Sequence, residues 1–250
     1  MVVTGTAGGM GRIAAIAFAS EGARVYGCDL NSAGNAETAE LVAAAGGIFH
    51  AGSVDLTDEI QTQNWIGQIA GKESGIDVLY LNAGTTKFNP IEDISLQEWQ
   101  WVLKHELDLV FLPLKASWKL LKNSRGNVVL VGSTAGTTGS VTNTRLTHTA
   151  AKGAVIAMTR QIAAEGAKYG IRANSVSPGM IQTPATEGDL LASDHPMRSI
   201  AKHIPLGRVG RAEEVVSCAL FLASDSASYV TGANLMVDGG WSAVLPGSNE

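Results

Sequence analysis

Short apolar runs alternate with longer amphipathic stretches along almost the whole chain, and this alternation limits the fold more than any other feature. The apolar runs end at Gly, Asn or Asp, as buried strands do, and the stretches between them follow the period of a helix. Strict alternation of this kind is typical of repeated βαβ units around a parallel sheet. The sequence therefore predicts an α/β fold, a doubly wound parallel sheet of seven strands with helices on both faces.

The boundaries of the elements follow from the apolar patterns. The strands are predicted at residues 1–3, 23–28, 47–50, 76–81, 127–132, 171–177 and 234–237. The helices are predicted at residues 10–20, 36–45, 58–70, 95–121, 149–167 and 212–223. Pro113 lies inside the fourth helix, where its missing N–H predicts a kink. From 178 to 205 the pattern is lost among Gly, Pro, Thr, Asp and His, so this long segment is predicted to be a substrate loop or lid.

Composition and charge narrow the functional classes. The chain of 250 residues is long enough for a sizeable core, and we expect a single domain over residues 1–250. Hydrophobic residues make up 45% and charged residues 16%, which excludes a disordered chain. The formal charge is -5 and no Lys/Arg-rich run occurs, so neither a nucleic acid nor an anionic membrane is an expected partner. A small-molecule substrate is expected instead.

The cysteines and the lengths of the apolar segments indicate the cellular compartment in which the protein is expected. Cys28 and Cys218 both lie in apolar stretches, and two thiols without a disulfide framework suit a reducing compartment. No apolar stretch approaches the roughly 18 residues that a membrane-spanning helix needs, and the first residues do not resemble a signal peptide. We therefore expect a cytoplasmic protein without disulfides.

A glycine-rich turn follows the first predicted strand and leads into the first helix. It reads TGTAGGMG over residues 4–11. Glycines let the backbone bend tightly and approach a pyrophosphate, whose charge meets the free N–H groups at the positive end of the helix dipole. The turn indicates a dinucleotide site that includes Gly5, Gly9, Met10 and Gly11, although small residues alone would also relax a loop.

An acidic residue, Asp29, ends the second predicted strand eighteen positions after Gly11. A carboxylate at this place in a dinucleotide site binds the ribose hydroxyls. It would also repel the 2'-phosphate of NADP, and neither Gly8 nor Leu30 offers a compensating positive charge. NAD is therefore the predicted cofactor, with Asp29 and Leu30 among the residues that bind it. An ordinary turn residue at the end of a strand is the alternative for Asp29.

Further short motifs follow the predicted strands in a fixed order. DLT at 55–57 follows the third strand, LNAG at 81–84 the fourth and PGMIQTP at 178–184 the sixth, and PLGR at 205–208 and VDGGW at 237–241 complete the series. Together with the TGxxxGxG turn, these motifs make the chain resemble the classical short-chain dehydrogenase/reductase family over essentially its whole length. The resemblance implies a Rossmann-type fold and a nicotinamide-dependent oxidoreductase.

The resemblance assigns nucleotide contacts to individual residues. They are Asp55 and Leu56 with adenine, Asn82, Ala83 and Gly84 with the adenine and ribose floor, Pro178 and Gly179 in the turn after the sixth strand, and Ile181 and Thr183 with the nicotinamide carboxamide. Taken singly, each motif has an ordinary explanation, because Asp55 could cap the following helix and the others could be plain turns. Their joint order favours the nucleotide site.

The reaction site departs from the family pattern at two positions. Family members use Asn, Ser, Tyr and Lys, with the Tyr and the Lys four positions apart on one helix face. Lys152 and Ser133 match the lysine that holds the nicotinamide ribose and the serine that orients the substrate oxygen. His148 stands at the tyrosine position and Glu106 at the asparagine position. Both replacements concern proton handling.

A histidine can give or take the proton that accompanies hydride transfer. The leading hypothesis is an NAD-dependent oxidoreductase that interconverts a secondary alcohol and a ketone through Ser133, His148, Lys152 and Glu106. Two alternatives stay open, a non-redox enzyme on the same scaffold and a non-catalytic NAD-binding protein. Arg145, three positions before His148, could anchor an acidic substrate or pair with Glu106. No metal site is predicted.

The resemblance also implies a homotetramer, because the family's long fourth and fifth helices pack across a two-fold axis. The corresponding helices carry apolar residues that we expect to be partly exposed in a single chain, namely Trp101, Leu109, Leu112, Val155, Ile156 and Met158. Association through these helices would cover that surface.

Overall fold

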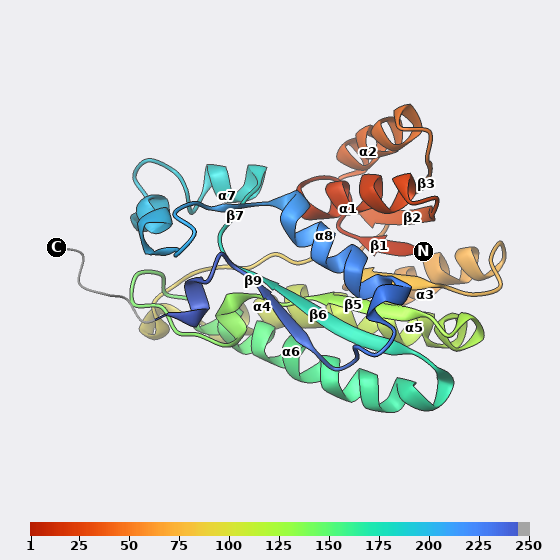
Figure 1. The fold of residues 1–250 in the computed structure, drawn as a ribbon. Coiled ribbons are helices and arrows are strands. Elements are labelled where there is room, and N and C mark those ends of the chain that lie inside the picture. Colours follow the sequence, from red (N-terminus) through yellow and green to blue (C-terminus); the bar gives the residue numbers. More distant parts are fainter. Residues whose placement is uncertain (245–250) are drawn as a thin grey trace.

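The computed structural model describes residues 1–244, and its centre is a parallel sheet of seven strands (Figure 1). The strands are β1 (Val2–Thr4), β2 (Arg24–Asp29), β3 (Ile48–Ser53), β4 (Val78–Leu81), β5 (Asn127–Val131), β6 (Arg172–Pro178) and β9 (Asn234–Val237). Their order is β3-β2-β1-β4-β5-β6-β9, and all neighbours are parallel. Because the order reverses between β1 and β4, a ligand crevice is expected outside the carboxyl ends of these strands.

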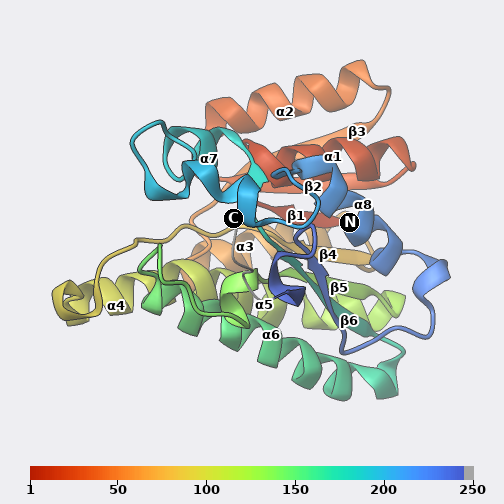
Figure 2. The same ribbon diagram turned by 60° about the vertical axis from the view of Figure 1, so that its left-hand side comes forward.

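Helices cover both faces of the sheet (Figures 1 and 2). They are α1 (Gly9–Ser20), α2 (Ser32–Ala44), α3 (Glu59–Ala70), α4 (Leu96–Leu103), α5 (Leu109–Ser124), α6 (Leu146–Gly166), α7 (Pro184–Gly188) and α8 (Ala212–Ala223). Helices α1, α2 and α8 pack on one face, and α3, α5 and α6 pack on the other. None of the described helices combines the length and the apolar surface needed to span a bilayer.

The alternation of side chains along the strands builds two separate apolar cores. Val2 faces the core that contains Ile66 of α3 and Val155 of α6, whereas the next residue, Val3, faces the core that contains Phe18 of α1. Full burial of such a side chain contributes about 1.5–3 kcal/mol. Central strands such as β4 and β5 are therefore largely apolar on both faces and read as hydrophobic runs, whereas β6 also buries Asn174, Ser175 and Ser177.

The predicted fold class is confirmed, and most element boundaries agree within one to three residues. Two elements are longer than predicted. Strand β3 was expected at 47–50 but continues to Ser53, because it pairs residue by residue with β2 as far as Asp29. Helix α2 begins at Ser32 instead of residue 36, because the Asn31 side chain accepts a hydrogen bond from the N–H of Gly34 and caps the helix earlier.

The helix predicted at 95–121 is interrupted ahead of its proline. Helix α4 ends at Leu103, residues Lys104–Asp108 form a π-helical turn, and α5 continues through Pro113. A proline ring presses on the carbonyl four residues earlier, here that of Leu109, and removes one N–H. The wider π turn directly before Leu109 accommodates this disturbance. The irregularity predicted at Pro113 therefore lies earlier, in the turn that contains Glu106.

The segment 178–205 has more local structure than its composition indicated. It holds α7, a 3-10 helix (Pro196–His203) and strand β7 (Ile181–Gln182), which pairs with β8 (Gly210–Arg211) in a small second sheet. Its own residues Met180, Met197, Ile200 and Ile204 form a third apolar cluster. In Figures 1 and 2, α7 lies beyond the carboxyl end of β6. The segment therefore stands beside the expected crevice.

The apolar residues expected to be partly exposed on the long helices divide into two groups. Half-buried side chains are Trp101, Leu112 and Met158. Buried side chains are Leu109, Val155 and Ile156. The expectation was wrong for the second group, because these residues point into the chain's own interior instead of outward.

Gly11→Ala is expected to destabilise the turn before α1. A Cβ at Gly11 would lie 1.9 Å from the carbonyl oxygen of Gly5, a backbone atom that cannot rotate away. Overpacking of this kind costs about 1–3 kcal/mol or more of unfolding free energy, which denaturant titration of the cofactor-free protein measures.

Gly8→Ala is the matched control in the same turn. Gly8 has an extended backbone, and nothing lies within 4 Å of the place where its Cβ would stand. Its unfolding free energy should therefore stay within about 0.5 kcal/mol of the wild-type value. Equal unfolding midpoints for the two variants would show that the close approach of Gly11 to Gly5 does not constrain the turn.

Candidate active site

A cleft of about 900 Å³ lies over the carboxyl ends of β1, β2 and β4. Its volume suits a dinucleotide, since ligand pockets range over about 300–1,000 Å³. Most nucleotide residues predicted from the sequence line it, namely Gly5, Gly9, Met10, Asp29, Leu30, Asp55, Leu56, Asn82, Ala83, Gly84 and Thr183. Gly11 is buried behind the turn, where it lets α1 approach the backbone of Gly5.

The glycine-rich turn adopts a backbone that favours glycine. Gly5 and Gly9 have φ angles of 75° and 52°, in the left-handed region that other residues rarely adopt. Helix α1 starts at Gly9 without a side-chain cap, because its N-cap residue is Gly8. The first N–H groups of the helix are thus free to bind an anion. These features fit the pyrophosphate of a dinucleotide.

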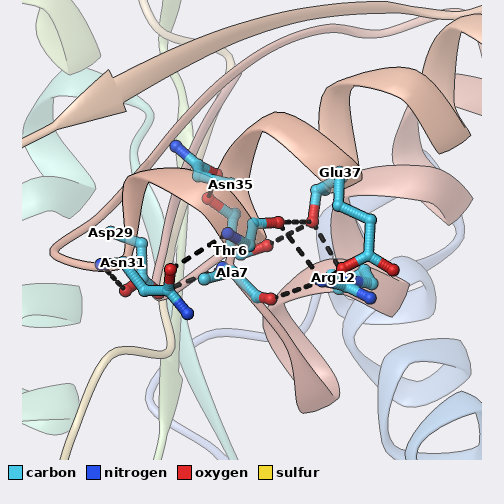
Figure 3. A network of polar contacts seen from close by, with 9 residues as sticks. Thr6, Ala7, Arg12, Asp29, Asn31, Asn35 and Glu37 are labelled. Carbon is cyan, nitrogen blue, oxygen red and sulfur yellow. Dashed lines mark hydrogen bonds and ion pairs between the residues drawn. The ribbon is translucent and has the colours of Figure 1, made fainter.

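Asp29 is fixed at the rim of the cleft by two backbone N–H groups (Figure 3). Ala7 donates to Oδ2 at 3.0 Å, and Asn31 donates to Oδ1 at 2.9 Å. The carboxylate therefore joins the end of β2 to the glycine-rich turn. Each oxygen keeps a lone pair with which it can accept a hydrogen bond from a ribose hydroxyl.

Arg12 of α1 also lines the cleft, but its guanidinium is held by α2 (Figure 3). Nη2 donates to the carbonyl of Ala7 at 2.6 Å and to the Glu37 carboxylate at 2.7 Å, and Nε donates to Thr38 Oγ1 at 3.0 Å. The Glu37 carboxylate neutralises its charge. The sequence analysis did not identify this residue, because its partners come from a separate helix.

Asn82 connects β4 to β1 at the point where the strand order reverses. The N–H groups of Asn82 and Ala83 both donate to Thr4 Oγ1 at 3.0 Å, and Asn82 Nδ2 donates to the carbonyl of Thr4 at 3.1 Å. The Oδ1 atom of Asn82 is buried without a partner among residues 1–244. This acceptor at the wall of the cleft is available to a ligand.

Asp55 forms a local turn instead of a helix cap. The N–H and the hydroxyl of Thr57 donate to its Oδ1 at 2.9 and 2.7 Å, and the hydroxyl contact in particular lowers the pKa of Asp55. The cap of α3 is Asp58, whose carboxylate accepts from two N–H groups of that helix. Asp55 therefore remains a charged acceptor along the cleft, as the nucleotide prediction requires.

A second cavity of about 290 Å³ continues from the nucleotide cleft towards α6. The two spaces share part of their lining, including Asn82, Gly84 and Thr183. The second cavity brings together every residue predicted for the reaction and the remaining nucleotide residues, namely Glu106, Ser133, His148, Lys152, Pro178, Gly179 and Ile181. We call it the substrate cavity.

Glu106 and His148 form a close pair in the substrate cavity. His148 Nδ1 lies 2.7 Å from Oε1 and 3.0 Å from Oε2 of Glu106. Glu106 comes from the π-helical turn and is only 2% exposed, and His148 comes from the first turn of α6. The ring of Phe88 packs edge-on against the imidazole, with centroids 5.7 Å apart. The imidazole is therefore held in one orientation.

Lys152 lies one helical turn after His148 and is also buried. Its Nζ donates to the carbonyl of Val131 at 3.1 Å and lies 4.0 Å from Oε1 of Glu106. Burial lowers the pKa of Lys152, and the Glu106 carboxylate opposes this shift. Lys152 and Glu106 are therefore opposite charges that compensate each other in the interior.

Ser133 directly follows β5 at the edge of the substrate cavity. Its Oγ accepts a hydrogen bond from the N–H of Ala135 at 3.1 Å. Within the described part of the chain, no acceptor takes the hydrogen of this hydroxyl. Ser133 can therefore donate a hydrogen bond to a substrate oxygen, as the resemblance implies.

Several lining residues were not selected from the sequence. They are Thr85, Thr86, Phe88, Thr134, Asn143, Met180, Thr186, Leu190, Met197 and Trp241. Most of them lie in loops or in the segment 178–205. These parts of the sequence have no hydrophobic periodicity that would predict which side chains face the cavity. The VDGGW motif contained one of them, Trp241, but nothing in the motif related it to the substrate.

Comparison with known proteins gives matches over nearly the full chain. A family model described as Enoyl-(Acyl carrier protein) reductase matches residues 5–242. The chain is 35% identical to Dehydrogenase/reductase SDR family member 6 of Rattus norvegicus, and 34% identical to cyclopentanol dehydrogenase of Comamonas testosteroni; each alignment covers 97% of this chain and 96% of the relative. A Beutenbergia cavernae structure assigned as an NAD(P) dependent gluconate 5-dehydrogenase, with bound NADP at low occupancy, superposes with a TM-score of 0.90 at 35% identity and covers 97% and 96% of the two chains.

These matches extend from the glycine-rich turn to the VDGGW motif, and the relatives share the sheet and the helices around it. The chain belongs to the short-chain dehydrogenase/reductase family, whose members are oxidoreductases that bind a nicotinamide cofactor.

Proposed function

We propose that this protein is an NAD-dependent oxidoreductase that interconverts a secondary alcohol and a ketone, with His148 as the proton carrier in place of the family's tyrosine. The contact between His148 and Glu106 carries the proposal. Burying a carboxylate costs several kcal/mol unless it is paired. Glu106 is compensated by the charge of Lys152 and by its hydrogen-bond contact with His148 Nδ1, and both partners belong to the proposed relay.

The contact with Glu106 determines which nitrogen of His148 acts on the substrate. A carboxylate can only accept hydrogen bonds, so Nδ1 carries the hydrogen in this contact. Nε2 then has the free lone pair and can take the proton of a substrate hydroxyl. The imidazolium that results is stabilised by the carboxylate 2.7 Å from Nδ1. Ketone reduction uses the same proton in the opposite direction.

Ser133 and Lys152 support this proton transfer. The Ser133 hydroxyl would hold the substrate oxygen, and the Lys152 charge would stabilise negative charge that develops on it. A bound nicotinamide ring would supply the hydride acceptor or donor for the reaction. Ile181 and Thr183, which line the substrate cavity where it joins the nucleotide cleft, are the residues proposed to hold the carboxamide of that ring.

The charges at the rim of the cleft support NAD over NADP. The Asp29 carboxylate stands where a 2'-phosphate would approach, and the nearest basic side chain of the turn, Arg12, is already paired with Glu37. The Beutenbergia cavernae relative was solved with bound NADP. Whether this chain prefers NAD or NADP therefore depends on the residues at the rim of its own nucleotide cleft.

The substrate cavity supports a small secondary alcohol. Its volume of about 290 Å³ lies at the lower end of the usual range for ligand pockets. Its lining includes the apolar side chains of Phe88, Met180, Leu190, Met197 and Trp241. Cyclopentanol dehydrogenase, a relative at 34% identity, is named for a secondary alcohol of this size class.

Four wider features are proposed from the sequence, the last of them from the family resemblance. The whole chain is one dinucleotide-binding domain, and the segment 178–205 closes over the substrate as a lid. The protein is a cytoplasmic homotetramer that associates through α4, α5 and α6. The exposed Phe111 and the half-buried Trp101 and Met158 on these helices support such an interface.

NAD should bind at least about tenfold more tightly than NADP, since a difference of about 1.4 kcal/mol is sufficient for that ratio. Repulsion between Asp29 and the 2'-phosphate is the cause. Asp29→Asn should lower the ratio of the two affinities, and Asp93→Asn, at an exposed position in the loop before α4, should leave it unchanged. Calorimetric titration measures both affinities. An equal affinity for NAD and NADP would remove the role assigned to Asp29.

His148→Ala should lower kcat for alcohol oxidation by about 100- to 10,000-fold, the usual contribution of general acid/base catalysis. NAD affinity should stay nearly constant, because His148 is not among the residues that line the nucleotide cleft. His50→Ala, on the exposed face of edge strand β3, is the control and should keep full activity. Full turnover by His148→Ala would exclude His148 as the proton carrier and favour the non-redox or non-catalytic alternative.

Glu106→Gln should lower kcat by roughly tenfold or more, because the amide keeps the shape of the side chain but loses the charge that stabilises the imidazolium. KM should change much less, since the proposed role of Glu106 acts through its contact with His148 Nδ1. Steady-state kinetics separate the two constants. Glu92→Gln, at an exposed position, is the control. A rise in KM at constant kcat would place Glu106 in substrate binding instead.

A further inference from the structure

Arg145 is a positive charge in the substrate cavity that the proposed reaction does not use. It is the N-cap residue of α6, immediately before the helix that carries His148 and Lys152. Its Nη2 donates to the carbonyl and to Oγ1 of Thr138, both at 3.1 Å. Its Nε is buried without a partner, and Nη1 contacts no acceptor within residues 1–244. The guanidinium thus retains unused donors.

No carboxylate of the described chain neutralises Arg145. Glu106 is the only acidic residue in the lining of the substrate cavity, and its oxygens are engaged by His148 and Lys152. The pairing of Arg145 with Glu106 that the sequence left open is therefore not formed. Burial lowers the pKa of Arg145, as expected for a cation that loses water without gaining a counter-ion.

The place of Arg145 relates its charge to the reacting atoms. It precedes His148 by three residues, at the N-cap of the helix that carries His148, and both side chains line the same cavity. Asn143 and the buried hydroxyl of Thr86, which has no partner among the described residues, line the same cavity. Ser133, His148 and Arg145 therefore belong to the lining of one cavity.

We propose that Arg145 binds a carboxylate on the substrate, so that the alcohol is a short hydroxy acid and the ketone is the corresponding keto acid. The inference rests on the proposed oxidoreductase function and names its substrate class. A guanidinium binds a carboxylate through charge-assisted hydrogen bonds and selects it over a neutral group. The small cavity limits the chain length between the carboxylate and the carbinol. The carboxylate takes no part in the reaction and only positions the hydroxyl.

Matched substrates test the proposal with the full-length enzyme and NAD. The probes are short straight-chain 2-, 3- and 4-hydroxy acids, each compared with its primary amide, which has nearly the same shape and no charge. The kcat/KM for at least one acid should exceed that for its amide by about 30-fold or more, as expected for a partly buried charge pair. Arg145→Gln should lower this ratio at least about tenfold, and Arg145→Lys should restore part of it.

Arg160→Gln is the matched control, because Arg160 is exposed on the same helix, outside the lining of the cavity. It should leave the ratio of acid to amide unchanged. Thermal unfolding of the Arg145→Gln variant shows whether the loss of the Thr138 contacts affects folding, and Arg145→Lys provides the second variant if it does.

Binding separates this inference from the proposed function. If no alcohol is oxidised, calorimetric titration of acids and amides into the NAD-loaded protein still measures selectivity. If an acid then binds more tightly than its amide, and Arg145→Gln removes this difference, the carboxylate site is supported although the oxidoreductase proposal fails. Oxidation of neutral alcohols with no preference for acids, or acid binding that Arg145→Gln leaves unchanged, would overturn the carboxylate site.

Discussion

The buried carboxylate of Glu106 is the constraint on which the rest of the active site depends. At 2% exposure it has lost nearly all contact with water, and an unpaired charge in such a place would be strongly destabilising. His148 and Lys152 lie four residues apart on α6, so that both reach the carboxylate from the same side of that helix. A change at any of these three positions therefore alters the electrostatics of the other two.

The sheet explains why the site lies where it does. All seven strands run in the same direction, so every loop that leaves a carboxyl end emerges on one edge, and the reversal of strand order between β1 and β4 opens a crevice there. Ser133 follows β5, and Asn82 follows β4. The π-helical turn brings Glu106 from a different layer to the same edge. Two rigid cores thus support a site built from loops and helix ends.

The sequence predicted the sheet and the glycine-rich turn from local patterns, and the residues proposed from the family motifs line the two cavities. Buried parallel strands are apolar throughout, and motifs that follow them must meet at one edge. Other features depend on partners distant in the chain. The π turn interrupts a stretch that the sequence predicts as one helix, the length of β3 depends on its pairing with β2, and the pairing of Arg12 depends on the position of α2. Hydrophobic periodicity in the sequence does not predict contacts of this kind.

The bonds of Arg12 have a consequence for how the nucleotide binds. Arg12 links the glycine-rich turn to Glu37 and Thr38 of α2, and Asp29 holds the same turn from the side of β2 (Figure 3). The turn is therefore already ordered before a dinucleotide arrives, and little conformational entropy is lost when its backbone closes on the phosphates. The nucleotide half of the site is therefore preorganised. Segments without such hydrogen bonds account for most of the conformational entropy that is lost on binding.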